Sequence, residues 1–349
     1  MCNLLLLLVF ILTSCSGILR ESINLQPVVY DNLQGFSEES SAEAFAAFKK
    51  SCQGFIAKKP ADTMIKIGQI SFKYSMLQNV CQKIPIVGTK DTNLFFKENF
   101  TPYLLTSNRA DLAHFTGYFE TELEGSREKI YPYIYPIYQK PRDLDAIKPY
   151  FSRQEIDKGA LNGKGLELVW VKDKIRLFFL HVQGSGKIRL IDGSTINVSY
   201  AAKNNRPYVS IGKYLVEMGA ITQEKPSKTD IEEWFKGNPD RVNEVLAQNP
   251  SYIFFRQAEG PIGASGDILT SNGSLAVDNK FIPYGIPIWI ETKINKNNIE
   301  FRRLLISQDT GSAIKGAMRG DIFFGSGNVA EELAGYQNSM GRYFVLLPR

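Results

Sequence analysis

The sequence predicts a mixed α+β protein in which a β-rich block interrupts a larger domain that ends in a small β-barrel. The first observation is the order of patterns: helical periodicity up to residue 112, strand patterns from residue 115, a helical return, and short strands from residue 251. The second is size, because 349 residues, 44% of them hydrophobic, are enough for two domains or one large one. The third is that strands and helices do not alternate regularly, which argues against a doubly wound α/β sheet.

The N-terminus carries an export signature. Residues 4–12, LLLLLVFIL, form an apolar run that is shorter than the ~20 residues needed to cross a bilayer and is typical of a signal sequence. The stretch Leu12-Thr13-Ser14-Cys15 resembles the lipobox of bacterial lipoprotein signals. This resemblance implies that residues 1–14 are removed and that Cys15 is lipidated. Ser16, which stands where an aspartate would signal inner-membrane retention, implies the outer membrane.

A tether over residues 15–40 leads into two stretches with helical patterns, 41–57 and 63–83, joined by Lys58-Lys59-Pro60. A helical hairpin of this kind could bring Cys52 and Cys81 together, and an exported protein meets an oxidising compartment that permits a disulfide. Two independent free thiols in the core are the alternative. The sequence therefore predicts either a bond between these two cysteines or two buried thiols.

From Phe115 the pattern changes to strands. FTGYFETELEG and YPYIYPIYQKP alternate in polarity, and the long segment 170–200, WVKDKIRLFFLHVQGSGKIRLIDGSTINVSY, carries glycine-bounded hairpin signals. Helical periodicity returns at 208–218 and at 229–247, where Thr229 is a suitable cap and Asn-Pro follows the end. We expect a β-rich unit with a helical return, followed from residue 251 by the short strands of a compact barrel.

Three acids stand at the edges of apolar strands in this last block: Asp278, Asp309 and Asp321. If they converge at one end of a barrel, their mutual repulsion keeps at least one carboxyl protonated near neutral pH. A protonated carboxyl is what a general acid needs in order to donate to a leaving oxygen. The alternative is that each is a turn acid that binds local backbone amides. Three acids in one glycine-rich unit favour a site.

Asp309-Thr310-Gly311-Ser312 also matches the active-site loop of aspartic proteases. Those enzymes need two such loops, because two carboxylates share one proton. This chain has one, so a protease would require a homodimer with Asp309 on the two-fold axis, for which the sequence offers no argument.

Composition excludes other classes. The net charge is +5 without a long basic run, so a nucleic-acid partner is not indicated. The two histidines, His114 and His181, lie far apart in sequence and lack the histidine or cysteine partners that zinc or copper requires. We therefore expect no metal and no other cofactor.

Several motifs together are recognisable. Residues 276–278, 308–316 (QDTGSAIKG) and Gly320-Asp321 resemble the 3D domain, a double-psi β-barrel named for three aspartates. FTGYFE (115–120), HVQGSG (181–186), RPYVSIGKYL (206–215) and QNPSYIFFR (248–256) resemble the membrane-bound lytic murein transglycosylase A family. With the lipobox, this resemblance covers nearly the whole chain after the signal.

The resemblance implies a groove between a large domain with the barrel and an inserted domain. The expected division is a signal (1–14), a lipid-anchored tether (15–40), a helical part of the large domain (41–112), the inserted domain (113–250) and the barrel (251–349). The resemblance makes Asp321 the catalytic acid and Asp309 and Asp278 supporting acids. It implies these groove residues: Thr116, Gly117, Tyr118, Gln183, Gly184, Ser185, Gly186 and Lys315.

The implied reaction is lytic cleavage of peptidoglycan between N-acetylmuramic acid (MurNAc) and N-acetylglucosamine (GlcNAc). Asp321 protonates the linking oxygen, the C6 hydroxyl of MurNAc attacks its own C1, and a 1,6-anhydro end forms without water. Two alternatives stay open: a hydrolase on the same barrel, with Asp309 or Asp278 as base, and a non-catalytic peptidoglycan-binding lipoprotein. Expected partners are glycan strands, the periplasmic face of the outer membrane of a Gram-negative bacterium, and proteins of cell-wall synthesis or division.

Overall fold

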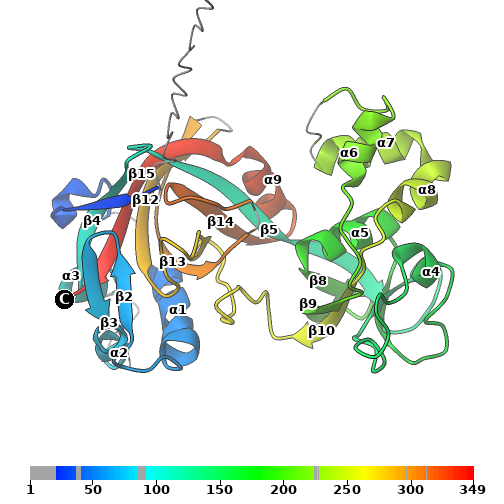
Figure 1. Ribbon diagram of the computed structural model, residues 1–349, viewed down its shortest axis with the longest axis horizontal. Coiled ribbons are helices and arrows are strands. Elements are labelled where there is room, and N and C mark those ends of the chain that lie inside the picture. Colours follow the sequence, from blue (N-terminus) through cyan, green and yellow to red (C-terminus); the bar gives the residue numbers. More distant parts are fainter. Residues whose placement is uncertain are drawn as a thin grey trace, which may run out of the picture.

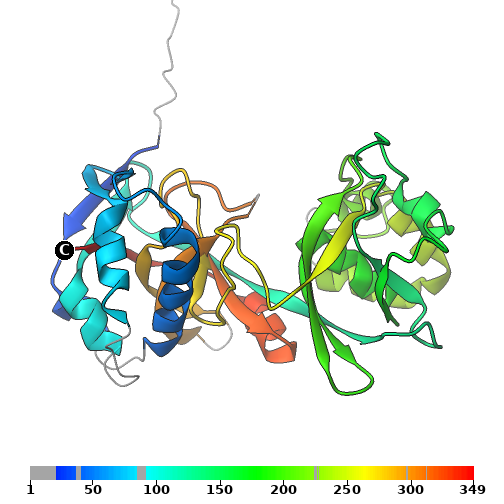
Figure 2. The same ribbon diagram turned by 90° about the horizontal axis from the view of Figure 1, so that it is seen from below.

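The computed structural model describes residues 21–36, 41–84, 92–223, 226, 228–295, 298–311 and 313–349. The predicted signal at 1–14 and the predicted lipidation site, Cys15, lie outside the described residues. The chain forms two bodies, which are joined by the long strand β5 and by the return segment between β10 and β11 (Figures 1 and 2). The predicted mixed α+β class is confirmed.

The larger body is built on a sheet that closes into a barrel. Its strands follow, in spatial order, β1 (Ile23–Pro27), β4 (Phe100–Ser107), β15 (Asn338–Pro348), β12 (Pro287–Ile294), β13 (Ile299–Asp309), β11 (Ser274–Ala276), β14 (Arg319–Ser326) and β5 (Ala113–Ser126). Strand β15 also pairs with the start of β5, with Asn338 opposite Thr116, and this pairing closes the barrel. Its interior is apolar and includes the fully buried rings of Phe115, Trp289 and Tyr343. Strand β1 lies within the predicted tether, which therefore ends before Ile23.

Short elements cover one side of the barrel. They are η1 (Tyr30–Asn32), α1 (Ala42–Ser51), the π-turn η2 (Cys52–Ile56), β2 (Met64–Ile67), β3 (Ile70–Lys73), α2 (Tyr74–Cys81) and α3 (Thr92–Asn99). The expected helix at 63–83 is wrong in its first half. Ile65 and Ile67 alternate with exposed neighbours, which is a strand period, and Gly68 takes the left-handed φ of +57° that a tight hairpin turn requires.

The smaller body is a second, barrel-like sheet. Strands β5, β8 (Ser185–Leu190), β9 (Thr195–Lys203) and β10 (Ile253–Ala258) lie side by side, and β7 (Glu167–Val171) joins β5 to β6 (Tyr135–Tyr138). A bridge between Gln139 and Phe255 brings the two edges together. The helices around it are α4 (Arg153–Asp157), α5 (Lys174–Gln183), α6 (Ile211–Glu217), α7 (Lys228–Gly237), η4 (Pro239–Arg241) and α8 (Val242–Ala247).

Helices replace expected strands in two places. Residues 174–183 form α5 because the Asp173 side chain accepts hydrogen bonds from the N–H groups of Ile175 and Arg176, and Gly184 ends the helix at φ +84°. Residues 328–336 form α9 (Asn328–Tyr336), which begins after Gly327 at φ +88°. The predicted helix at 229–247 is present but interrupted at Pro239, since proline bars a helical conformation in the residue before it.

Cys52 and Cys81 are joined by a disulfide, with their Cα atoms 5.5 Å apart. The bond ties the end of α1 to the end of α2, although a β-hairpin, not a second long helix, carries the chain between them. Of the helices in the described ranges, none has the length and apolar character that crossing a membrane requires.

The disulfide closes a loop of 29 residues. Replacing both cysteines with alanine should lower the free energy of unfolding by about 3 kcal/mol, because the unfolded chain gains the entropy that the cross-link removes. Denaturant unfolding of the two proteins measures the difference, with a reductant added to the unsubstituted protein as a second comparison. An unchanged unfolding midpoint in both comparisons would contradict the stabilising role.

Candidate active site

The register of three neighbouring strands brings two of the predicted acids to one face of the barrel. Ala276 on β11 lies opposite Asp309 on β13 and opposite Asp321 on β14. Residues in register point to the same side of a sheet, and two strand spacings separate the two acids by about 10 Å at the backbone. Asp321 in turn lies opposite Thr116 on β5, and Phe323 lies opposite Tyr118.

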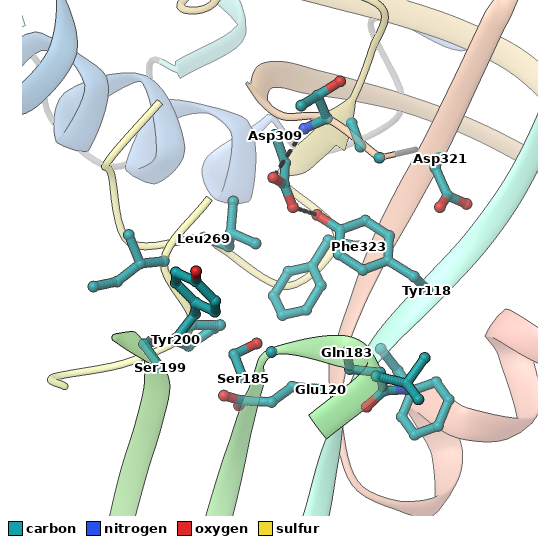
Figure 3. Close-up of a pocket in the computed structure, with 18 of the residues that line it drawn as sticks. Tyr118, Glu120, Gln183, Ser185, Ser199, Tyr200, Leu269, Asp309, Asp321 and Phe323 are labelled. Carbon is teal, nitrogen blue, oxygen red and sulfur yellow. Dashed lines mark hydrogen bonds between the residues drawn. The ribbon is translucent and has the colours of Figure 1, made fainter. Parts of the chain in front are cut away.

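These side chains line one wall of a groove of about 590 Å³ between the two bodies (Figure 3). The barrel wall presents Tyr118, Asp309, Asp321 and Phe323, and the return segment adds Leu269. The wall of the smaller body presents Glu120, Gln183, Ser185, Ser199, Tyr200 and Arg256. Both bodies therefore contribute to one site.

Asp321 has the environment of a proton donor. The Thr116 hydroxyl donates to Asp321 Oδ1 over 2.6 Å, and Thr116 itself accepts from Arg319 Nη2 over 3.1 Å. Burial raises the pKa of the Asp321 carboxyl, an effect that the hydrogen bond from Thr116 and the Arg319 charge oppose and that Asp309 reinforces. The hydrogen bond occupies Oδ1, which leaves Oδ2 as the oxygen that can carry the proton.

Asp309 is held much more tightly. It accepts hydrogen bonds from the Tyr118 hydroxyl (2.8 Å, dashed in Figure 3), from the Ala264 N–H (2.9 Å) and from the Thr310 N–H (2.8 Å). Burial raises the pKa of Asp309 while these donors lower it, and burial beside Asp309 raises the pKa of Tyr118 well above its usual value. Tyr118 therefore stays protonated as a donor, and both carboxylate oxygens of Asp309 are committed.

Asp278 is not part of the groove. Its side chain accepts from the N–H groups of Gly316 (2.8 Å) and Lys280 (3.2 Å), and it is absent from the residues that line the groove. It fastens the loop between β13 and β14 to the end of β11. Asp278 thus makes the contacts of a turn acid that binds backbone amides, which was the alternative to a role in the site.

The predicted groove residues divide into two groups. Tyr118, Gln183, Gly184 and Ser185 line the groove, and Thr116 reaches it through Asp321. The other three, Gly117, Gly186 and Lys315, do not line it.

The glycines in the second group are fixed by packing. A Cβ on Gly117 would lie 2.4 Å from a ring carbon of Phe324, and one on Gly186 would lie 2.3 Å from Leu180 Cδ1. Lys315 is exposed on the loop that Asp278 holds.

Four residues of the second wall, Glu120, Ser199, Tyr200 and Arg256, are not among the predicted groove residues. Glu120 could have been found, because Thr116, Tyr118 and Glu120 alternate along one strand and so share a face. Ser199, Tyr200 and Arg256 carry no such signal, since only the pairing of β8, β9 and β10 brings them to the groove.

Glu120 adds a carboxyl to Asp309 and Asp321 in the groove. Its side chain is 4% exposed, and its Oε1 has no hydrogen-bond partner among the described residues. Burial raises its pKa to about 7, against the attraction of Lys187 and with the repulsion of Glu122. At neutral pH this carboxyl is therefore close to half protonated.

Neither histidine belongs to a cluster suited to a metal, and the described ranges contain no group of three or more His, Cys, Asp or Glu residues that could hold one. His181 Nδ1 lies 3.1 Å from Arg153 Nη1, and burial beside this guanidinium lowers the His181 pKa well below its usual value. His114 Nε2 lies 2.6 Å from Asn338 Oδ1.

Comparison with known proteins gives consistent matches. A family model described as the MltA specific insert domain matches residues 114–256, and the 3D domain model matches residues 273–347. The membrane-bound lytic murein transglycosylase A of Vibrio cholerae is 37% identical over 241 residues, which are 66% of this chain and 64% of the relative. The match thus spans just under two thirds of that relative's length.

Solved structures match over nearly the whole chain. MltA from Neisseria gonorrhoeae superposes with a TM-score of 0.82 at 31% identity and covers 93% of each chain. Escherichia coli MltA with bound chitohexaose superposes with a TM-score of 0.68 at 27% identity and covers 94% of each chain.

The buried Glu120 carboxyl should make stability depend on pH. Because its pKa is about 7 in the folded chain and about 4.5 in the unfolded chain, folding loses up to about 3 kcal/mol from this group as pH rises from 4.5 to 8. Glu120→Gln removes this loss. When the free energies of unfolding are measured at pH 4.5, 6 and 8, the glutamine variant should become increasingly stable relative to the unsubstituted protein as the pH rises. A difference that does not change with pH would contradict the assignment.

Proposed function

This chain belongs to the MltA family of membrane-bound lytic murein transglycosylases, and from that premise we propose that it cleaves peptidoglycan between MurNAc and GlcNAc, leaving 1,6-anhydroMurNAc ends. The single observation that carries the proposal is Asp321. It is a largely buried carboxyl with a raised pKa, it has one oxygen held by Thr116, and it stands in a groove lined by both bodies.

The reaction needs one acid that works twice. Protonated Asp321 donates to the oxygen that links C1 of MurNAc to C4 of GlcNAc, and the C1–O bond breaks. The MurNAc C6 hydroxyl then attacks C1 of the same sugar and returns its proton to the Asp321 carboxylate. The number of protons on Asp321 is restored and no water is consumed. Proximity within one ring favours this attack over attack by solvent.

The surroundings of Asp309 and Asp278 argue against either of them as the base or nucleophile of a hydrolase. A hydrolase needs a second carboxylate that activates water or acts as the nucleophile. Asp309 accepts three hydrogen bonds that fix it as an anchor for Tyr118 and the return segment, and Asp278 lies outside the groove. We infer that Asp309 and Asp278 act by positioning the site.

The substrate class follows from the groove and from one relative. The groove presents the ring of Tyr118, the side-chain amide of Gln183, the backbone of Gly184 and the hydroxyl of Ser185. Such groups suit a polar glycan. A structure of E. coli MltA holds chitohexaose, a chain of β-1,4-linked GlcNAc. We propose that a glycan strand of peptidoglycan occupies the equivalent groove here.

We further propose a location and a division of the chain. Removal of residues 1–14 and lipidation of Cys15 would anchor the protein at the periplasmic face of the outer membrane of a Gram-negative bacterium, where its substrate lies. Residues 23–112 and 259–349 would form the large domain and residues 113–258 the inserted one, because β1 pairs within the barrel and β10, which the predicted division assigned to the barrel, pairs within the smaller body.

Digestion of purified peptidoglycan by the full chain, followed by mass spectrometry of the products, tests the reaction. Anhydro ends, lighter than reducing ends by one water, are expected. Asp321→Asn should lower the rate at least ~100-fold, as expected for loss of a general acid. Reducing ends would indicate a hydrolase. Full activity of Asp321→Asn together with loss of activity in Asp309→Asn would reverse the two roles.

Thr116 should position Asp321 and tune its pKa. Thr116→Val removes the hydrogen bond that lowers the pKa of Asp321, so the alkaline limb of the rate profile should move to higher pH while kcat falls about 10-fold. Thr116→Ser keeps the hydroxyl and should restore both values. A loss of kcat with an unmoved pH profile would mean that the valine only disturbs packing.

A further inference from the structure

A row of polar side chains crosses the wall of the smaller body. The parallel register of Thr121 with Gly186 places Glu120 on β5 beside Ser185 on β8. Ser185 is opposite Ser199 on β9, and Ser199 is opposite Arg256 on β10. All four line the groove, and Figure 3 shows Glu120 next to Ser185, with Ser199 further along the same wall. We call Glu120, Ser185, Ser199 and Arg256 the polar row.

Two atoms of the polar row are buried without a partner. Glu120 Oε1 and Ser199 Oγ find no hydrogen-bond partner among the described residues, and each residue is 4% exposed. Buried polar atoms in folded proteins are almost always paired. Two unpaired atoms in one wall of a groove therefore point to a ligand that pairs them.

The chemistry of the polar row indicates a neutral group that both donates and accepts. In its ionised form the Glu120 carboxylate only accepts, whereas a serine hydroxyl can donate. The backbones at Glu120 and Ser185 lie one strand spacing apart, about 4.8 Å. An amide group can therefore contact both side chains at once. Arg256 in the row and the nearby charge of Lys187 disfavour a cationic ligand, and Glu120 disfavours an anionic one.

We propose that the polar row reads the acetamido group of an N-acetylated hexosamine, with Glu120 accepting from its N–H and the serine hydroxyls donating to its carbonyl oxygen. Glu120, on the wall opposite Asp321, is then a specificity-determining residue that selects sugars with an N-acetyl group. This inference rests on the proposed function, because it assumes a glycan in the groove.

Binding without turnover tests the polar row. The full chain carrying Asp321→Asn is titrated calorimetrically with chitohexaose and with the fully de-N-acetylated hexamer. This Asp321→Asn protein, the parent of the variants below, should bind chitohexaose at least 10-fold more tightly than the de-N-acetylated hexamer. Adding Glu120→Leu should weaken chitohexaose at least 10-fold and shrink this preference, whereas Glu120→Gln, which keeps an acceptor, should stay within about 3-fold of the parent.

A matched control comes from the same strand. Glu124 lies four residues further along β5, its side chain is 46% exposed, and it pairs with Lys172 outside the groove. Glu124→Leu should leave both affinities unchanged. Ser199→Ala is the independent variant should Glu120→Leu unfold, and it should weaken chitohexaose about 3-fold or more.

Three outcomes would overturn the inference. They are equal binding of the two hexamers by the parent, undiminished binding by folded Glu120→Leu, and no measurable binding of chitohexaose by the parent. Failure of the proposed function is read separately, from the products that the chain with Asp321 intact releases from peptidoglycan. If the products carry anhydro ends but Glu120→Leu does not change the affinity for chitohexaose, the inference about the polar row is wrong and the proposed reaction stands.

Discussion

The site depends on one strand that belongs to both bodies. Strand β5 runs for 14 residues, pairing in parallel with β14 in the barrel and then with β8 in the smaller body. Its alternation sends Thr116, Tyr118 and Glu120 to the same side. Thr116 holds Asp321, Tyr118 holds Asp309, and Glu120 lies in the opposite wall. A slip of one residue in this register would turn all three away from the groove.

The other side of β5 is fixed by close packing, and this explains the glycines of the recognised motifs. Gly117 allows Phe324 and helix α9 to approach the strand, and Gly186 allows Leu180 of α5 to approach β8. Gly263 plays a similar part on the return segment, where a Cβ would lie 2.5 Å from the Gln308 carbonyl oxygen. That close approach delivers the Ala264 N–H to Asp309. These glycines shape the groove indirectly, because they allow neighbouring segments to pack closely against the strands that carry its residues.

The sequence predicted the parts of this arrangement that local patterns encode. The order of helical and strand regions and the acids at strand edges follow from periodicity and position. The sequence pattern of α5 predicts a strand, because its run of Phe178, Phe179 and Leu180 has the apolar density of a buried strand. Only the Asp173 cap and Gly184 at the C-terminal end indicate a helix. The second wall of the groove could not be predicted, because Ser199 and Arg256 meet Glu120 only through strand pairing.

Among the described residues three carboxyls line the groove, and their hydrogen bonds separate their roles. Asp309 accepts three, so it is already paired and stays fixed. Asp321 accepts one, which orients it and leaves an oxygen for a proton. Glu120 has an oxygen that none of the described residues satisfies. Burial raises the pKa of all three, so burial alone cannot assign an acid. The number of donors that the fold supplies distinguishes the anchor, the proton donor and the group left for a ligand.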